Sequence, residues 1–254
     1  MTIAPPTGKS GMPLPTHVLI GGRDTGGKRA LRAFIHFFAY HMFLSRRREC
    51  RVKAAGFSLE VPPTVFHPRV FRTSEFFATF ILGLDLTGKR VADVGTGSGI
   101  LALAAARAGA SKVVALDVNP AAVSATQRNA TSNGLGDRVT AMQSDLLAAL
   151  PPERAFDVII SSVPHFPGEA RDLADRGWHA GPDYRDVIDL FSQAEQRLTS
   201  TGVMYHKLSV HSDITRFGAL ISAAGFEARL AAEESIWIDR FFIYELRRPE
   251  RASP

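Results

Sequence analysis

The sequence contains a single cysteine, Cys50, among its 254 residues. One thiol excludes an internal disulfide and fits the reducing conditions of the cytoplasm, where we expect the protein to act. No cysteines and histidines have the spacing of a zinc site, so we expect no metal. Residues 1–15 are rich in proline, glycine and threonine and lack the apolar run of a signal peptide. We therefore expect residues 1–22 to form a disordered tail.

Charge of either sign is moderate, with 30 Lys and Arg against 25 Asp and Glu, a formal net charge of +5. A small excess of positive charge attracts anions weakly, and a soluble protein with a basic surface is as compatible with it as a nucleic-acid binder. The apolar fraction of 45% is sufficient for a core. The length allows one large domain, or one domain with an extension.

Long apolar runs are limited to one stretch near the N-terminus, where residues 24–49 have the pattern of a helix interrupted by His36 and His41. The run is too short to span a bilayer, so we expect no transmembrane segment. Basic residues flank it, which leaves three interpretations of residues 31–48: a cap packed on the rest of the protein, a peripheral membrane helix, or a basic clamp on RNA. We expect a helical N-terminal extension over residues 23–54.

The stretch Val91–Ile100 predicts a buried strand, a glycine turn and the start of a helix. Glycine at Gly95, Gly97 and Gly99 lets the backbone bend and a ligand approach closely. The helix that follows points its N-terminus at whatever lies over the glycines.

An acid, Asp93, stands two residues before this turn, and Ile100 occupies the place of the third glycine of a dinucleotide-binding motif. A carboxylate repels a pyrophosphate and attracts a cation. The stretch resembles the first motif of class I S-adenosylmethionine-dependent methyltransferases, whose cofactor carries an ammonium and a sulfonium but no phosphate. The alternatives are a dinucleotide binder and a purely structural turn. The resemblance implies S-adenosyl-L-methionine as the cofactor, held here by Asp93, Gly95, Thr96, Gly97 and Gly99.

Strand and helix patterns alternate from Lys89 onward, which predicts a parallel sheet with helices on both faces. We expect an α/β fold with a Rossmann-like, seven-stranded, mostly parallel sheet whose last strand is antiparallel, as the resemblance implies, in a catalytic domain over residues 55–248. The strands are expected at residues 91–94, 112–117, 139–143, 156–161, 202–208, 228–235 and 241–246. Helices are expected after the glycine turn and at residues 120–132, 146–150, 184–198 and 214–224.

Two further acids follow strands of this sheet. Asp117 lies about twenty residues after the glycine turn, where a carboxylate can accept hydrogen bonds from both ribose hydroxyls. Asp145 matches the acid that binds the adenine amino group in the resembled family, or it caps a short helix. We expect Val118 and Leu146, which follow these acids, to contact the cofactor as well.

The segment before the glycine turn, with Phe66-His67-Pro68 followed by Thr73-Ser74, is similar to the small-domain methyltransferases that include the release-factor glutamine methyltransferase-like group. In those proteins this turn and the following helix cover the cofactor. Thr73 and Ser74 therefore either touch the cofactor or cap their helix.

The segment after the fourth strand, Ser162 to Phe166, stands where the amino-methylating branch of the family carries Asn-Pro-Pro-Tyr. Ser162 replaces the amide residue, His165 replaces the tyrosine, and Pro164 is retained, so the acceptor need not be a planar amide or base nitrogen. His165 could accept a proton, stack on a substrate or fill space. We expect catalytic roles for Ser162 and His165, a cofactor contact for Ser162, and substrate contacts from Pro164, Phe166, Trp178 and His179.

The sequence therefore predicts a methyltransferase that acts by SN2 transfer on a nitrogen or oxygen of a small molecule or protein side chain. An RNA or DNA base methyltransferase is the first alternative, since the N-terminal third is basic. A non-catalytic cofactor-binding protein is the second, because Asn-Pro-Pro-Tyr is lost.

Overall fold

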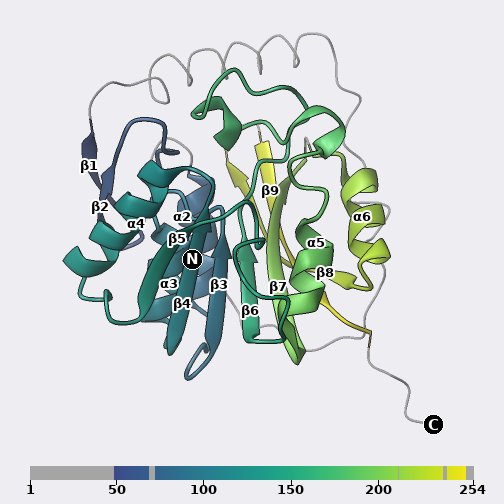
Figure 1. Cartoon of the computed structure of the whole chain (residues 1–254), viewed down its shortest axis with the longest axis horizontal. Coiled ribbons are helices and arrows are strands. Elements are labelled where there is room, and N and C mark those ends of the chain that lie inside the picture. The colour runs from purple at the N-terminus through teal and green to yellow at the C-terminus, as the bar shows by residue number, and fades with distance from the viewer. Residues whose placement is uncertain (1–48, 69–71, 211, 237–238, 250–254) are drawn as a thin grey trace.

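The computed structural model describes residues 49–68, 72–210, 212–236 and 239–249 (Figure 1). The predicted tail and the N-terminal apolar helix, with its candidate membrane contact at 31–48, lie outside the described residues. Within the described ranges, no helix is long and apolar enough to cross a membrane. The same ranges hold no cluster of side chains suited to a metal ion.

A seven-stranded sheet forms the centre of the molecule, in the order β5-β4-β3-β6-β7-β9-β8. Five strands run parallel, and they are β3 (Arg90–Val94), β4 (Lys112–Asp117), β5 (Val139–Gln143), β6 (Phe156–Ser161) and β7 (Leu198–Ser209). The last strand, β9 (Asp239–Arg247), is antiparallel to both β7 and β8 (Glu227–Ile236) and lies between them. The chain adds β4 and β5 on one side of β3 and the later strands on the other, so the strand order reverses at β3. The carboxyl ends of β3, β4 and β6 therefore lie at the switch point where ligands bind in such folds. The predicted α/β fold is confirmed.

Helices cover both faces of the sheet (Figure 1). One face carries α2 (Thr73–Leu82), α3 (Ile100–Arg107) and α4 (Pro120–Ser132), and the other carries α5 (Leu190–Arg197) and α6 (Ile214–Ala223). Every residue of α3 except Arg107 is buried, and the small alanines of this helix let it pack closely between the sheet and α2. The start of α4 is capped as expected, because the Asn119 side chain accepts a hydrogen bond from the Ala121 N–H at 2.9 Å.

Three local predictions are wrong. Residues 146–150 form turns instead of a helix, because Leu146 has a φ of +50° and two prolines follow at positions 151 and 152. The helix expected from residue 184 begins only at Leu190, after the short 3₁₀ turn Pro182–Tyr184. Thr73 does not cap α2: the capping position is Arg72, whose side chain makes no capping hydrogen bond.

A two-stranded hairpin precedes α2. Residues Phe57–Val61 form β2, which pairs with β1 at Cys50–Ala54. Residues 50–54, predicted as the end of the helical extension, are therefore strand. The physical reason is that Arg51 and Lys53 alternate with less exposed neighbours at a period of two, which suits a strand and not a helix.

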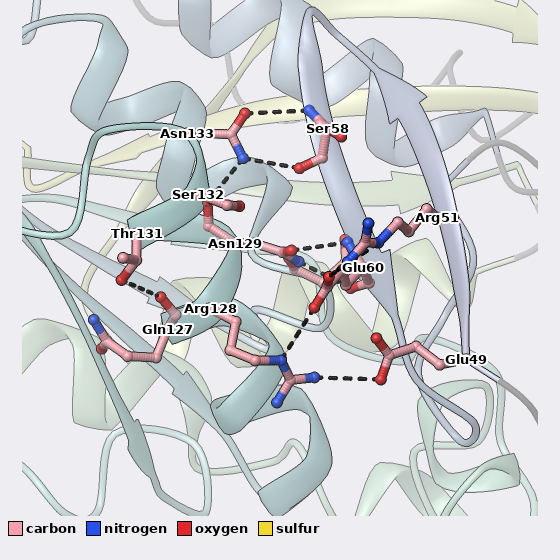
Figure 2. A network of polar contacts seen from close by, with 11 residues as sticks. Glu49, Arg51, Ser58, Glu60, Gln127, Arg128, Asn129, Thr131, Ser132 and Asn133 are labelled. Carbon is pink, nitrogen blue, oxygen red and sulfur yellow. Dashed lines mark hydrogen bonds and ion pairs between the residues drawn. The ribbon is translucent and has the colours of Figure 1, made fainter.

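The hairpin is attached to α4 through two asparagine side chains (Figure 2). Asn129 accepts a hydrogen bond from the Glu60 N–H at 2.8 Å and donates to the Glu60 carbonyl at 2.9 Å. Asn133 makes the same pair of bonds with the backbone of Ser58, at 3.1 and 2.8 Å. Four residues of helix rise about 6 Å and two residues of strand about 6.8 Å, so the two amides match alternate residues of β2. Together they satisfy backbone groups on the edge of the hairpin.

Asn129 also joins the hairpin to the glycine turn, because its Nδ2 donates a second hydrogen bond to the Ser98 carbonyl at 2.9 Å. The side chain is fully buried. A buried amide with these three bonds fixes the position of the turn relative to β2 and α4.

Candidate functional site

The glycine turn between β3 and α3 presents open backbone at Gly97. This residue has a φ of +57°, and a Cβ added to it would meet no atom within 4 Å. Gly99 differs, since a Cβ there would lie 2.9 Å from Thr126 Cγ2 of α4. Gly97 therefore leaves room for a ligand, as predicted, while Gly99 allows the close packing of α4.

Gly95 lies against the segment that follows β6. A Cβ on Gly95 would be 3.4 Å from Val163 Cγ1 and 3.5 Å from the Ser162 carbonyl oxygen. The turn is also held to β4, since the N–H groups of Gly95 and Thr96 both donate to the Leu116 carbonyl, at 2.9 and 3.0 Å. The structure thus brings together the predicted cofactor turn and the predicted acceptor segment.

Asp93 is fully buried beneath this turn. The Thr96 hydroxyl donates to its Oδ2 at 2.7 Å, and within the described part of the chain its Oδ1 has no hydrogen-bond partner. Burial raises the pKa of Asp93 to about 7 against the lowering effect of the Thr96 bond, and the nearby Asp117 carboxylate raises it further. A buried carboxyl with one unpaired oxygen is suited to a cationic partner.

Asp117, at the end of β4, binds the turn directly. Its Oδ2 accepts from the Gly97 N–H and its Oδ1 from the Asn119 N–H, both at 2.9 Å. Each oxygen keeps a further lone pair that can accept from a hydroxyl. Burial raises the pKa of Asp117, whereas the Arg176 guanidinium favours its charged form. Arg176 thus lies near the same site, and the sequence alone did not indicate this.

Asp145 is exposed and follows β5, where the Ser144 N–H donates to the Asp117 carbonyl at 3.0 Å. A cavity of about 260 Å³ adjoins it, lined by Asp145 and Leu146 on one side and by Arg185 and Asp189 on the other. This space beside Asp145 is compatible with the predicted adenine contact.

The loop after β6 carries an aromatic cluster. Phe166 stacks on Trp178, with ring centroids 5.3 Å apart and planes at 14°, and its ring lies 4.5 Å from that of the buried His165. Trp178 also lies 5.9 Å from Phe66, which precedes α2. Three of the four predicted substrate residues are gathered here, since a bridge pairs Phe166 with His179.

One carboxylate organises the same loop. Asp175 is fully buried and accepts hydrogen bonds from the Arg171 N–H at 3.1 Å and from Arg171 Nε at 2.9 Å. His179 Nδ1 lies 3.4 Å from Asp175 Oδ1. Burial raises the pKa of Asp175, but the bonds from Arg171 outweigh it and hold the pKa at about 2. This ionised anchor places Trp178 and His179 beside Phe166.

The remaining predicted residues lie at the same edge of the sheet. Val118 and Leu146 follow β4 and β5 and are half-buried, as are Ser162 and Pro164 after β6. Thr73 is buried at the first position of α2, and the neighbouring Ser74 is half-buried. The contacts of these residues with a cofactor stay predictions.

Two side chains of β7 stand out. His206 is fully buried beside Phe191 and Phe217, and burial lowers its pKa to about 3. Lys207 is also buried, and the sequence analysis did not single it out. The available signal was a charged residue inside a strand of apolar neighbours, since lysine is almost never fully buried unless it is paired.

The strand order, the glycine turn and the acids at three strand ends are accompanied by a clear structural likeness: the chain has the fold of class I methyltransferases. Residues 73–163 match the family model of ribosomal protein L11 methyltransferase (PrmA). The ribosomal protein L11 methyltransferase of Escherichia coli (strain 55989 / EAEC) is 37% identical over 113 residues, which are 44% of this chain and 37% of that protein. The chain thus spans well under half the length of this curated relative.

Solved structures extend the likeness beyond the matched segment. The ribosomal protein L11 methylase of Lactobacillus delbrueckii subsp. bulgaricus has a TM-score of 0.53 at 22% identity, over 74% of this chain and 84% of that one. The T. thermophilus 16S rRNA methyltransferase RsmC, in complex with AdoMet and guanosine, has a TM-score of 0.57 at 24% identity, over 79% of this chain and 50% of that one.

The buried Asp93 gives a prediction about stability. Its ordinary pKa of 3.8 is raised to about 7 in the folded protein, so the ionised carboxylate destabilises the fold increasingly as the pH rises through this interval. We expect the stability of Asp93→Asn relative to the parent to rise by about 2 kcal/mol between pH 5 and pH 8. Urea unfolding at the two pH values measures this. Asp137→Asn, which changes an exposed carboxylate, is the control variant. The prediction would be contradicted if the difference in unfolding free energy between Asp93→Asn and the parent were the same at both pH values.

Proposed function

We propose that the protein is an S-adenosylmethionine-dependent methyltransferase that transfers a methyl group to a nitrogen or oxygen of a small molecule or protein side chain. The observation that carries the proposal is the open backbone of Gly97 with Asp93 buried beneath its turn and Asp117 bound to its N–H, and Asp145 follows the neighbouring strand β5. This set suits a nucleoside that has positive charge and no phosphate.

Each acid has a distinct role in holding the cofactor. Asp93 would bind the positively charged methionine end, Asp117 the ribose hydroxyls and Asp145 the adenine amino group. Val118 and Leu146 would flank the base, while Thr73, Ser74 and Ser162 would contact the cofactor from α2 and from the end of β6. The bound cofactor supplies a methyl group already activated by the sulfonium, so the protein must mainly align the acceptor and accept a proton.

The segment after β6 would perform this alignment. The stacked rings of Phe166 and Trp178, with Pro164 and His179, offer a surface for the acceptor. The Ser162 hydroxyl can donate or accept a hydrogen bond, and the His165 imidazole can take up a proton.

The relatives named for ribosomal protein L11 favour a protein side chain as the acceptor. The short segment before α2 supports a finer proposal, that the protein has the small-domain layout of the release-factor glutamine methyltransferase-like group. A base in RNA is the second candidate, supported by the net charge of +5 and by the fold likeness to a 16S rRNA methyltransferase. We place the protein in the cytoplasm because it has a single cysteine, Cys50.

Two measurements test the proposal. Calorimetry should detect binding of S-adenosylmethionine and no binding of NADP. Incubation with radiolabelled cofactor and fractionated cell extract should then place label in protein or small molecules, whereas label in RNA would favour the second candidate. Binding without any label transfer would support a non-catalytic protein, and the absence of cofactor binding would overturn the proposal.

His165 provides a separate prediction. If its imidazole accepts the proton, His165→Phe and His165→Ala should both lower turnover by about 100-fold, with the affinity for cofactor unchanged. His165→Phe keeps a ring beside Phe166 and removes only the proton acceptor. Near-normal turnover of His165→Phe together with a low turnover of His165→Ala would assign the residue to stacking instead.

A further inference from the structure

Lys207 lies beside the proposed acceptor site by the register of the sheet. Asp93 of β3 pairs with Ile160 of β6, and Ile160 pairs with Tyr205 of β7. Side chains two residues apart in a strand point to the same face. The register ends one residue further along, where Ser161 of β6 pairs with His206 of β7. Lys207 and Ser162 each follow this last pair directly, and adjacent strands are about 4.8 Å apart, so Lys207 lies near Ser162 at the carboxyl end of the sheet.

The face in question is the one covered by α2. Tyr205, two residues before Lys207, packs its ring against Phe80 of α2 at 5.2 Å. On the other side, Lys207 pairs in register with the fully buried Ile243 of β9. The lysine is thus enclosed at the edge where the carboxyl end of the sheet meets the proposed acceptor segment.

The ammonium of Lys207 has no counter-ion among the residues that the structure describes. The residue is 6% exposed, and no hydrogen bond or ion pair of the described residues involves its amine. Burial lowers the pKa of Lys207 to about 8, with no opposing contribution from a carboxylate. Removing an ammonium from most of its hydration destabilises a protein, and methionine at the same position would avoid that cost.

We propose that Lys207 binds an anionic oxygen group, a carboxylate or a phosphate, of the methyl acceptor, and so selects acceptors whose negative charge lies close to the atom that is methylated. Ser162 stands between the glycine turn and Lys207, so an acceptor that contacts Ser162 has its neighbouring group within reach of the lysine. This inference depends on the proposed function, because only a methyltransferase would bind a methyl acceptor at this site.

The first test uses inorganic phosphate and acetate as probes. Lysine labelled with ¹³C at Cε is followed by NMR, and the Lys207 resonance is assigned from its loss in Lys207→Met. We expect a saturable shift of this resonance with one of the two probes, and no such shift with chloride at matched ionic strength. The probe that produces the shift identifies the group. The inference would be overturned if the Lys207 resonance shifted no more than the resonances of the exposed lysines. It would also be overturned if chloride produced the same shift as the probe.

Thermal unfolding gives a second readout that also checks folding. Lys207→Met removes a buried charge, so it should fold and unfold at a temperature no lower than the parent. The successful probe should raise the unfolding temperature of the parent and of the control Lys112→Met, which changes an exposed lysine, but not that of Lys207→Met. An equal rise in all three proteins would contradict the inference.

Label transfer separates anion binding from proton transfer. With an acceptor fraction labelled by the parent, Lys207→Met should raise the KM at least tenfold and Lys207→Arg should restore much of it, because arginine keeps the charge. Loss of turnover in both variants at unchanged KM would make Lys207 a base and overturn the inference. Cofactor calorimetry on the same samples distinguishes this failure from failure of the proposed function, which would remove cofactor binding from the parent itself.

Discussion

Asn129→Leu is expected to lower the free energy of unfolding by about 3–5 kcal/mol. The leucine would abolish three hydrogen bonds and leave the part-buried N–H and carbonyl of Glu60 and the buried Ser98 carbonyl without their partner. Each unsatisfied buried polar group costs about 1–3 kcal/mol. Urea unfolding followed by circular dichroism measures the loss.

Asn133→Leu is the matched control, because Asn133, the C-cap residue that follows α4, makes the same pair of backbone bonds with Ser58 at a more exposed position. Water can replace those bonds, so we expect a loss of about 1 kcal/mol or less. Equal losses in the two variants would show that the burial of Asn129 is not what makes it important.

Asp117→Ala is expected to weaken cofactor binding by about 100-fold or more, which corresponds to roughly 2.7 kcal/mol. The variant loses the acceptor for the ribose hydroxyls and also the bonds that hold the N–H groups of Gly97 and Asn119. Calorimetry with S-adenosylmethionine measures the change.

Two comparisons make this result specific. Asp145→Ala removes a single proposed contact at an exposed position, so about a tenfold loss is expected. Glu153→Ala, which changes an exposed acid before β6, leaves all three acids intact and should bind cofactor as the parent does. Parent-like affinity of Asp117→Ala would refute its assignment to the ribose.

The order of the central elements was predictable because their signals are local. Val91 and Val94 lead into a turn that requires glycine at Gly97, and Asn119-Pro120 marks the start of a helix on its own. Each of these patterns depends on the backbone conformation of a few adjacent residues. The alternation of strands and helices could therefore be predicted without knowledge of tertiary contacts.

The elements that were missed depend on contacts between distant segments. The strand Cys50–Ala54 is stable because its partner β2 is attached to Asn129 and Asn133, about 70 residues later. Leu146 has a left-handed backbone conformation, which cannot be predicted from an apolar residue in the sequence. A lysine inside the segment of β7 was a signal that the sequence offered, but its position near Ser162 follows only from the register of the sheet.

The position of β9 has a consequence for biosynthesis. During translation β8 leaves the ribosome before β9, yet among the described strands of the finished sheet it pairs with β9 alone. Until β9 inserts, β7 has an unpaired edge and β8 lacks its strand partner. Unpaired strand edges can pair with other chains and cause aggregation. Nascent chains stalled before residue 239 should therefore be the species most dependent on chaperones.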